Sequence, residues 1–154
     1  MLQSTLCYLE RGEEYLMLHR VKKAHDANRD KWIGIGGKFE RGESPEDCIL
    51  RETKEETGLT LTDYRLRGVL TFVYNDDDEE MEYIFLYTAD GFAGELAECN
   101  EGTLEWVPKT QIDRLNLWEG QYAPTGLSTN RLKGVHILDH YVSMDEYNAN
   151  RDAR

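Results

Sequence analysis

Three glutamates, Glu52, Glu55 and Glu56, stand at positions i, i+3 and i+4 of one segment of the chain. Side chains at those offsets share a face of an α-helix, so the three carboxylates would lie together. Their repulsion costs roughly 0.2–0.5 kcal/mol for each pair on a solvated helix. A hard divalent cation such as Mg²⁺ would remove that cost, because it prefers oxygen ligands from carboxylates, water and phosphate. The spacing therefore favours a metal–phosphate site.

A glycine-rich stretch precedes these glutamates. Gly34, Gly36 and Gly37 allow the backbone to come close to a ligand or a metal. Arg51 stands four residues before Glu55, a spacing at which an arginine can orient a carboxylate on the same helix. A glycine-rich loop followed by an acidic helix suits the binding of a metal–phosphate complex.

The helix that carries the glutamates is expected over residues 45–57. Ser44 is a suitable N-cap, and Pro45 fits the first helical position. Asp47 places an acid where it complements the helix dipole, and Gly58 provides a suitable end.

Segments typical of strands lie on both sides of this helix, in the ranges 4–10, 15–20, 66–74, 82–88 and 103–107. We expect a loop over 21–31, a solvated hairpin loop over 75–80 and a short helix over 109–115. The stretch 119–134 is rich in turn residues, and 135–147 is compatible with a helix or a strand. This order of elements predicts an α/β or α+β domain with a mixed sheet.

The composition narrows the classes of function. The chain has 154 residues and a net charge of −12, with 18 Lys+Arg against 30 Asp+Glu. Its length suits one domain, and its charge argues against a nucleic-acid polymer as partner. We find neither a membrane-spanning apolar run nor a signal-peptide pattern, and the three cysteines form no CxxC pair. We therefore expect a cytoplasmic protein with no membrane partner.

The segment from Gly37 to Leu59 resembles the Nudix box, G-x5-E-x7-R-E-U-x-E-E-x-G-U, in which U is aliphatic. Every fixed residue is present, including Glu43. One aliphatic position departs, because Thr53 stands there, and its missing methyl packing should weaken the helix–sheet contact slightly. The resemblance implies an α/β/α sandwich with a mixed β-sheet. It treats residues 1–154 as one domain, covers about 4–119, and leaves 120–154 unassigned.

Two further runs, Lys31 to Lys38 and Cys99 to Val107, resemble the MutT-like nucleoside triphosphate diphosphatases, which include 8-oxo-dGTP diphosphatases. The resemblance implies hydrolysis of a small nucleotide to a nucleoside monophosphate and pyrophosphate. The implied cofactor is Mg²⁺, with Mn²⁺ as a substitute. Oligomeric state is not implied.

The resemblance also implies roles for individual residues. The implied catalytic residues are Glu52, Glu55, Glu56 and Arg51, with one glutamate serving as base for the attacking water. The implied metal ligands are the Gly37 carbonyl, Glu52, Glu55, Glu56 and Glu101. The implied substrate-binding residues are Arg20, Lys38, Phe72, Trp118 and Glu119. For Glu101 a solvated loop acid is an equal alternative, and for Phe72 a place in the core is the stronger one.

The substrate stays open among several alternatives. Ile33 stands where the mammalian oxidised-purine hydrolases carry a base-reading asparagine, and Trp118 is followed by one acid, Glu119, where those enzymes have two aspartates. The first hypothesis is therefore a triphosphate diphosphatase with oxidised dGTP as a candidate substrate. A hydrolase of ADP-ribose or another nucleoside diphosphate derivative is the second. A non-catalytic nucleotide-binding regulator is the third, disfavoured because all box glutamates are present.

Overall fold

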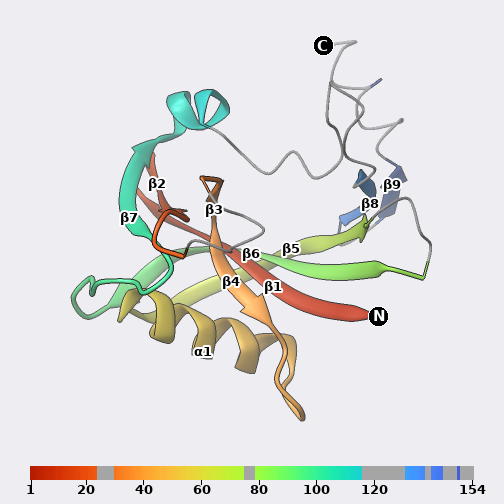
Figure 1. Ribbon diagram of the computed structural model, residues 1–154, viewed down its shortest axis with the longest axis horizontal. Helices are drawn as coiled ribbons and strands as arrows, with labels where there is room; N and C mark the ends of the chain where they lie inside the picture. Colours follow the sequence, from red (N-terminus) through yellow and green to blue (C-terminus); the bar gives the residue numbers. More distant parts are fainter. Residues whose placement is uncertain (24–29, 75–78, 116–130, 138–139, 144–148, 150–154) are drawn as a thin grey trace.

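The computed structural model describes residues 1–23, 30–74, 79–115, 131–137, 140–143 and 149. These residues form a mixed α+β fold in which one long helix lies against a mixed sheet (Figure 1). The elements are β1 (Leu2–Arg11), β2 (Glu14–His19), β3 (Trp32–Ile33), β4 (Ile35–Lys38), α1 (Pro45–Thr57), β5 (Thr60–Val73), β6 (Met81–Ala93), β7 (Thr103–Pro108), the 3₁₀ helix η1 (Lys109–Arg114), β8 (Arg131–Ile137) and β9 (His140–Ser143).

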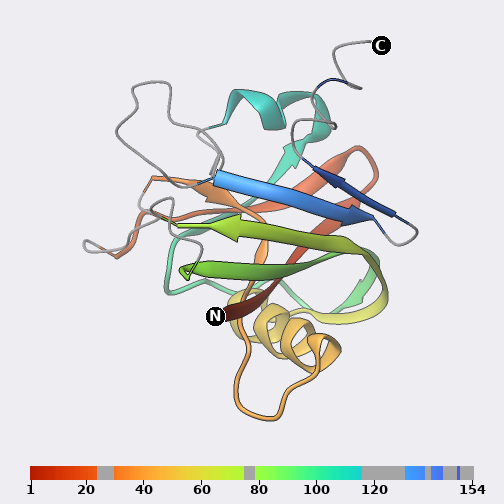
Figure 2. The same ribbon diagram turned by 90° about the vertical axis from the view of Figure 1, so that its right-hand side faces the viewer.

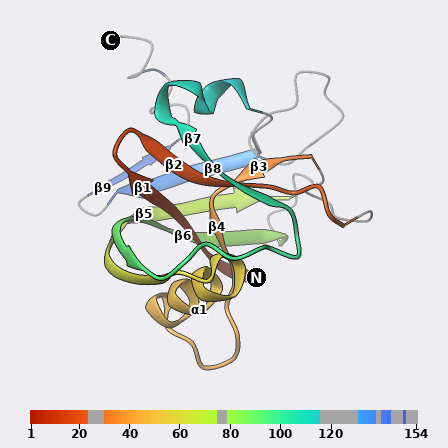
Figure 3. The same cartoon turned by 90° about the vertical axis from the view of Figure 1, so that its left-hand side faces the viewer.

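The sheet is organised around β1, which divides its hydrogen bonds between two parts. Its first half pairs with β4 and, in parallel, with β6, whereas its last residues pair with β2. The order of strands is β3-β2-β1-β6-β5-β8-β9, with β4 on β1 and β7 on β2. In Figure 3, β2 and β7 lie at one end of the molecule, with η1 above them and α1 at the opposite side. The mixed sheet predicted from the sequence is confirmed.

Helix α1 begins and ends where its sequence signals predict. The backbone N–H of Asp47 donates to the Ser44 hydroxyl at 3.1 Å, and the Asp47 carboxylate accepts from the Ser44 N–H at 3.0 Å. This reciprocal pair satisfies two donors that a helix start leaves open. At the other end Gly58 adopts φ +78°, a conformation that glycine takes without strain.

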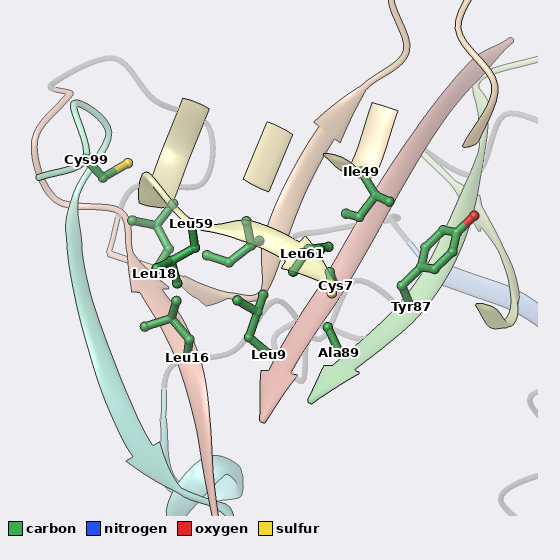
Figure 4. Packing of buried hydrophobic residues seen from close by; sticks show 11 residues of the cluster. Cys7, Leu9, Leu16, Leu18, Ile49, Leu59, Leu61, Tyr87, Ala89 and Cys99 are labelled. Atoms are coloured by element: carbon green, nitrogen blue, oxygen red, sulfur yellow. The ribbon is translucent and has the colours of Figure 1, made fainter. Parts of the chain in front are cut away.

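The hydrophobic core lies between α1 and the sheet and continues into the β2–β7 part. Figure 4 shows Ile49 of α1 over Cys7 and Leu61, and Leu16 and Leu18 of β2 near Leu9. Ile49, Cys7, Leu9 and Leu18 are fully buried. The core therefore fixes α1 against the first half of β1, beside β4.

The C-terminal region forms strands in 135–147, where the sequence left a helix or a strand open, and β8 already begins at Arg131, within the stretch that the sequence described as rich in turn residues. β8 pairs with β5 in antiparallel fashion and β9 pairs with β8, so both extend the sheet beyond β5 (Figure 2). β5 begins at Thr60 and β6 ends at Ala93, so both strands are longer than predicted. Their polar ends still pair with each other. The pairing of Val73 with Met81 agrees with the predicted hairpin, although residues 75–78 lie outside the described ones.

Two threonines of α1 are fully buried but differ in their hydrogen bonds. Thr57 Oγ1 donates to the Thr53 carbonyl oxygen at 2.6 Å and accepts from the Leu59 N–H at 3.0 Å. Thr53 Oγ1 has no hydrogen-bond partner among the residues that the structure describes. Thr53 is the position that departs from the aliphatic pattern, so the departure buries an unpaired hydroxyl.

We expect Thr53→Val to raise the free energy of unfolding by about 1 kcal/mol, because a methyl replaces a buried polar group that gains no hydrogen bond. Thr57→Val is the matched control on the same helix. It should lower the free energy of unfolding by about 1–2 kcal/mol, because the Leu59 N–H loses its acceptor. Urea unfolding of both variants measures the two changes. A loss of stability in Thr53→Val would contradict the expectation.

Candidate active site

Strand β4 brings two glycines against the acidic face of α1. The Gly36 N–H donates to Glu56 Oε2 at 3.1 Å. A Cβ at Gly37 would lie 2.5 Å from the carboxylate carbon of Glu52, so a side chain there would displace that carboxylate. A Cβ at Gly36 would lie 1.9 Å from the Thr5 carbonyl oxygen of β1. Glycine at position 37 thus leaves room for the Glu52 carboxylate, and glycine at position 36 lets β4 lie close to β1.

Arg51 is the hub of the charged groups on this helix. Its Nε and Nη2 donate to the Glu43 carboxylate at 2.5 and 3.0 Å, and its Nη1 donates to Glu52 at 2.8 Å and Glu55 at 3.0 Å. Nη2 also donates to the Lys38 carbonyl oxygen at 3.1 Å, which ties the helix to the end of β4. These hydrogen bonds raise the pKa of Arg51 and hold the pKa of Glu43 at about 2.

Glu56 is the carboxylate that Arg51 does not contact. It is 7% exposed, and the Gly36 N–H is its hydrogen-bond donor. Burial, followed by the negative charges of Glu101 and Glu52, raises the pKa of Glu56 to about 9. Burial also raises the pKa of Glu52, although Arg51 opposes that shift. The surroundings of both carboxylates therefore favour the binding of an additional positive charge, either a proton or a cation.

Glu101 reaches the same place from the loop between β6 and β7. Arg20 Nη1 donates to Glu101 Oε2 at 2.9 Å, and Lys23 Nζ lies 3.6 Å from Glu101 Oε1. The Lys22 N–H also donates to the Glu101 carbonyl oxygen at 3.3 Å. The next residue, Gly102, packs so closely that a Cβ would lie 1.9 Å from the His19 carbonyl oxygen. Glu101 is therefore held by the basic segment after β2 and is no longer a freely solvated acid.

These groups surround one cavity of about 320 Å³. It is lined by Arg20, Gly36, Gly37, Lys38, Phe39, Glu40, Arg51, Glu52, Glu56 and Glu101. Three carboxylates from α1 and the β6–β7 loop thus share one cavity with Lys38 of β4 and with Arg20 of the segment after β2. The cavity is the size of a small-molecule site, and its polar lining suits a charged ligand.

The structure gathers most of the predicted site residues but not all of them. Glu55 does not line the cavity, because its carboxylate is bound to Arg51 and is 57% exposed. Phe72 is buried in β5, with its ring edge-on to Tyr74, and also lies off the cavity. Trp118 and Glu119 lie outside the described residues.

Several contributors to the site were not predicted as such. Glu43 anchors Arg51 from eight residues away, and Gly102 allows the loop of Glu101 to approach β2. Phe39 and Glu40 also line the cavity. The fixed spacing of Glu43 and Arg51 in the box could have predicted the first of these contacts. The glycine directly after Glu101 could have predicted the second.

The donor chemistry of the cavity fits a divalent cation. Glu52, Glu56 and Glu101 offer hard oxygen atoms, and the pKa of Glu56 is raised first by burial and then by the charges of Glu101 and Glu52. Across the residues that the structure describes, no three acidic, histidine or cysteine side chains are already close enough to form a metal site. The lining residues thus fit the cation by the type and burial of their side chains, and not by a ligand arrangement that is already formed.

Comparisons with known proteins find a matching family model and several similar chains. The model of the NUDIX domain matches residues 2–126. The uncharacterized Nudix hydrolase YvcI of Bacillus subtilis is 34% identical over 119 residues, which cover 75% of this chain and 72% of that protein. An oxidized purine nucleoside triphosphate hydrolase of Danio rerio is 34% identical over 88 residues, which cover 57% of this chain and 56% of that protein. This chain thus spans less than two thirds of the fish protein.

A solved structure shares the fold. The crystal structure of a MutT protein from Bacillus halodurans aligns with a TM-score of 0.67 and 28% identity, covering 76% of this chain and 74% of that one.

In the described part of the chain, no helix has both the length and the hydropathy needed to cross a bilayer.

The raised pKa of Glu56 predicts a pH dependence of stability in the absence of metal. Between its usual pKa of 4.5 and about 9, the folded protein keeps the proton that the unfolded chain releases, so stability falls as the pH rises. We expect Glu56→Gln to match the wild type near pH 5 and to be more stable at pH 8. The difference should grow by up to about 1.4 kcal/mol for each pH unit.

Unfolding in urea with EDTA, at several pH values, measures this difference. Glu105→Gln is the control, because Glu105 is an exposed acid on β7. A constant difference between wild type and Glu56→Gln across the pH range would show that the Glu56 carboxylate is not destabilised by its surroundings.

Proposed function

The chain belongs to the NUDIX domain family and is a Nudix hydrolase acting on a phosphoric anhydride, and we propose that its substrate is a nucleoside triphosphate. The proposed products are a nucleoside monophosphate and pyrophosphate. The observation that carries the proposal is the single cavity where Glu52, Glu56 and Glu101 meet Arg20 and Lys38. Such a set of groups can hold a cation and a polyphosphate side by side.

Glu52, Glu56 and Glu101 are the side chains that would hold Mg²⁺, or Mn²⁺ in its place, with the Gly37 carbonyl oxygen as a further donor. A cation bound there supplies charge neutralisation to the phosphates and lowers the pKa of water. Arg51 fixes the position of Glu52 through its 2.8 Å hydrogen bond. Glu55 keeps its predicted role as a ligand or base, although Arg51 holds it in this structure.

The basic side chains at the cavity have a separate proposed role. Lys38 is exposed at the end of β4, and Arg20 is 15% exposed beside Glu101. Both can donate to phosphate oxygens, which attract ammonium and guanidinium groups strongly. Arg20 would also keep Glu101 in the cavity through their 2.9 Å contact. The proposal thus assigns the triphosphate to the side of the cavity formed by these two residues.

The identity of the base is a finer part of the proposal. The name of the Danio rerio relative supports an oxidised purine, so 8-oxo-dGTP is the first candidate. Trp118 and Glu119 stay predictions for the base pocket. A cytoplasmic location is proposed on the sequence and on the three buried cysteines, Cys7, Cys48 and Cys99, which are unpaired as a reducing compartment would keep them.

Hydrolysis of a substrate panel tests the proposal. The panel contains dGTP, 8-oxo-dGTP, other triphosphates, ADP-ribose and diadenosine polyphosphates, each with Mg²⁺ or with EDTA, and ion exchange separates the products. We expect metal-dependent release of pyrophosphate and a monophosphate from a triphosphate. Glu56→Gln should reduce turnover about 100-fold or more, whereas Glu105→Gln should not. Cleavage of ADP-ribose alone, or nucleotide binding without turnover, would overturn the proposal.

A pair of glycine variants tests whether the place of Glu52 matters for turnover. The atoms nearest to a Cβ at Gly37 belong to the flexible carboxylate of Glu52, so Gly37→Ala should fold and lose about 100-fold in turnover. Gly36→Ala meets the backbone of Thr5, so it should lower the free energy of unfolding by several kcal/mol. Thermal unfolding and initial rates measure both effects. A fully active Gly37→Ala would show that the position of the Glu52 carboxylate is not critical.

A further inference from the structure

The central sheet has a second face, opposite α1, that the cavity does not account for. Side chains alternate between the faces of a strand, and Tyr87 and Ala89 of β6 belong to the core beneath α1. Glu82, Ile84 and Leu86 therefore point to the opposite face. In the paired strands the same face carries Leu2, Ser4 and Leu6 of β1 and Leu70 and Phe72 of β5. At these eight positions the face is apolar apart from Glu82 and Ser4.

Glu82 is an unusual residue to find there. It is 7% exposed, and the Tyr74 hydroxyl donates to its Oε2. Burial, together with the Glu82 carboxylate, raises the pKa of Tyr74, so the hydroxyl stays a donor. The other carboxylate oxygen, Oε1, has no hydrogen bond to any residue that the structure describes. A carboxylate has about four acceptor sites, and burying one that is only partly satisfied is costly.

Ser4 adds a second polar group with spare capacity on the same face. It is 6% exposed, and its hydroxyl makes no hydrogen bond within the described residues. Ser4 lies in register with Ile84, and Leu2 lies in register with Glu82, so Ser4 and Glu82 are diagonal neighbours on adjacent strands. Two convergent polar groups on an apolar surface are typical of a ligand site.

This polar pair adjoins the phosphate side of the cavity. Ser4 is also in register with Lys38 of β4, which lines the cavity. Strands lie roughly 5 Å apart and residues repeat roughly every 3.3 Å along them, so Glu82 is two strands and two residues from Lys38. That separation is within the reach of a nucleoside whose phosphates occupy the cavity.

We propose that Glu82, assisted by Ser4, binds the edge of the substrate's base and selects a guanine-type base. The inference rests on the proposed function and adds a residue that determines its specificity. An ionised carboxylate only accepts hydrogen bonds, and guanine presents two adjacent donors, N1–H and the exocyclic amino group. Adenine presents an acceptor at N1, which a carboxylate repels. Tyr74 is a positioning residue that holds the Glu82 carboxylate in place.

The ratio of kcat/KM for dGTP to that for dATP tests the inference. Glu82→Gln should lower this ratio about tenfold or more, because it removes the charged acceptor, mainly through slower use of dGTP. Tyr74→Phe should lower the ratio less, because the acceptor remains. Glu105→Gln should leave it unchanged. An equal loss on both nucleotides in Glu82→Gln would overturn the inference and indicate a structural role for the Tyr74–Glu82 hydrogen bond.

Binding of the products separates this inference from the proposed function. Calorimetric titration with dGMP and dAMP needs no turnover, so it applies even if the wild type cleaves no triphosphate and the proposed function fails. A preference for dGMP that is lost in Glu82→Gln supports the inference. Equal binding of the two monophosphates, or no binding of either, overturns it. If Glu82→Gln does not fold, Ser4→Ala is the second variant, and an unchanged preference in Ser4→Ala then counts against the inference.

Discussion

The crowding of carboxylates at the end of α1 is the constraint on which the rest of the structure depends. Glu52, Glu56 and Glu101 face one cavity, and each additional buried negative charge raises the energy of the others. The protein compensates two of them from its own side chains, because Arg51 contacts Glu52 and Arg20 contacts Glu101. Glu56 instead accepts from the Gly36 N–H, and its raised pKa means that it keeps a proton at neutral pH in the absence of metal. A divalent cation would replace that proton, and the fold has to hold these mutually repelling carboxylates rigidly in place for it.

The fold supplies that rigidity by local means. A reciprocal cap at Ser44 fixes where α1 begins, so the register of its glutamates is set relative to β4. Gly36 allows β4 to lie close to β1, Gly37 allows β4 to approach α1, and Arg51 closes the contact by donating to the Lys38 carbonyl oxygen. The core between α1 and β1 holds this arrangement from behind. Each of these interactions is modest alone, but together they place charged groups that would otherwise move apart.

The sequence predicted the parts of this site that depend on spacing along one element. The range of α1, its cap at Ser44 and the shared face of Glu52 and Glu56 follow from local rules, and the structure confirms the helix. It could not predict contacts between distant segments, such as that of Arg20 with Glu101, 81 residues away. Spacing did indicate the contact of Arg51 with Glu55, but it could not show that Glu56 would turn inward to the Gly36 N–H. The strands β8 and β9 were ambiguous because their pairing with β5 depends on partners far along the chain.

Under the proposed function, the two faces of the central sheet would bind different parts of a nucleotide. The helix-covered side gathers charges that only phosphate and metal can use, since three carboxylates leave little attraction for an uncharged ring. The part of the opposite face around Leu6, Ile84 and Phe72 is apolar and includes Glu82 and Ser4, so it suits a flat base whose edge must be hydrogen-bonded. Lys38 lines the cavity and is in register with Ser4, so β4 and β1 connect the two regions. If the base binds on the opposite face as proposed, the residues that contact it could change while the box glutamates remain, so one phosphate chemistry could serve substrates with different bases.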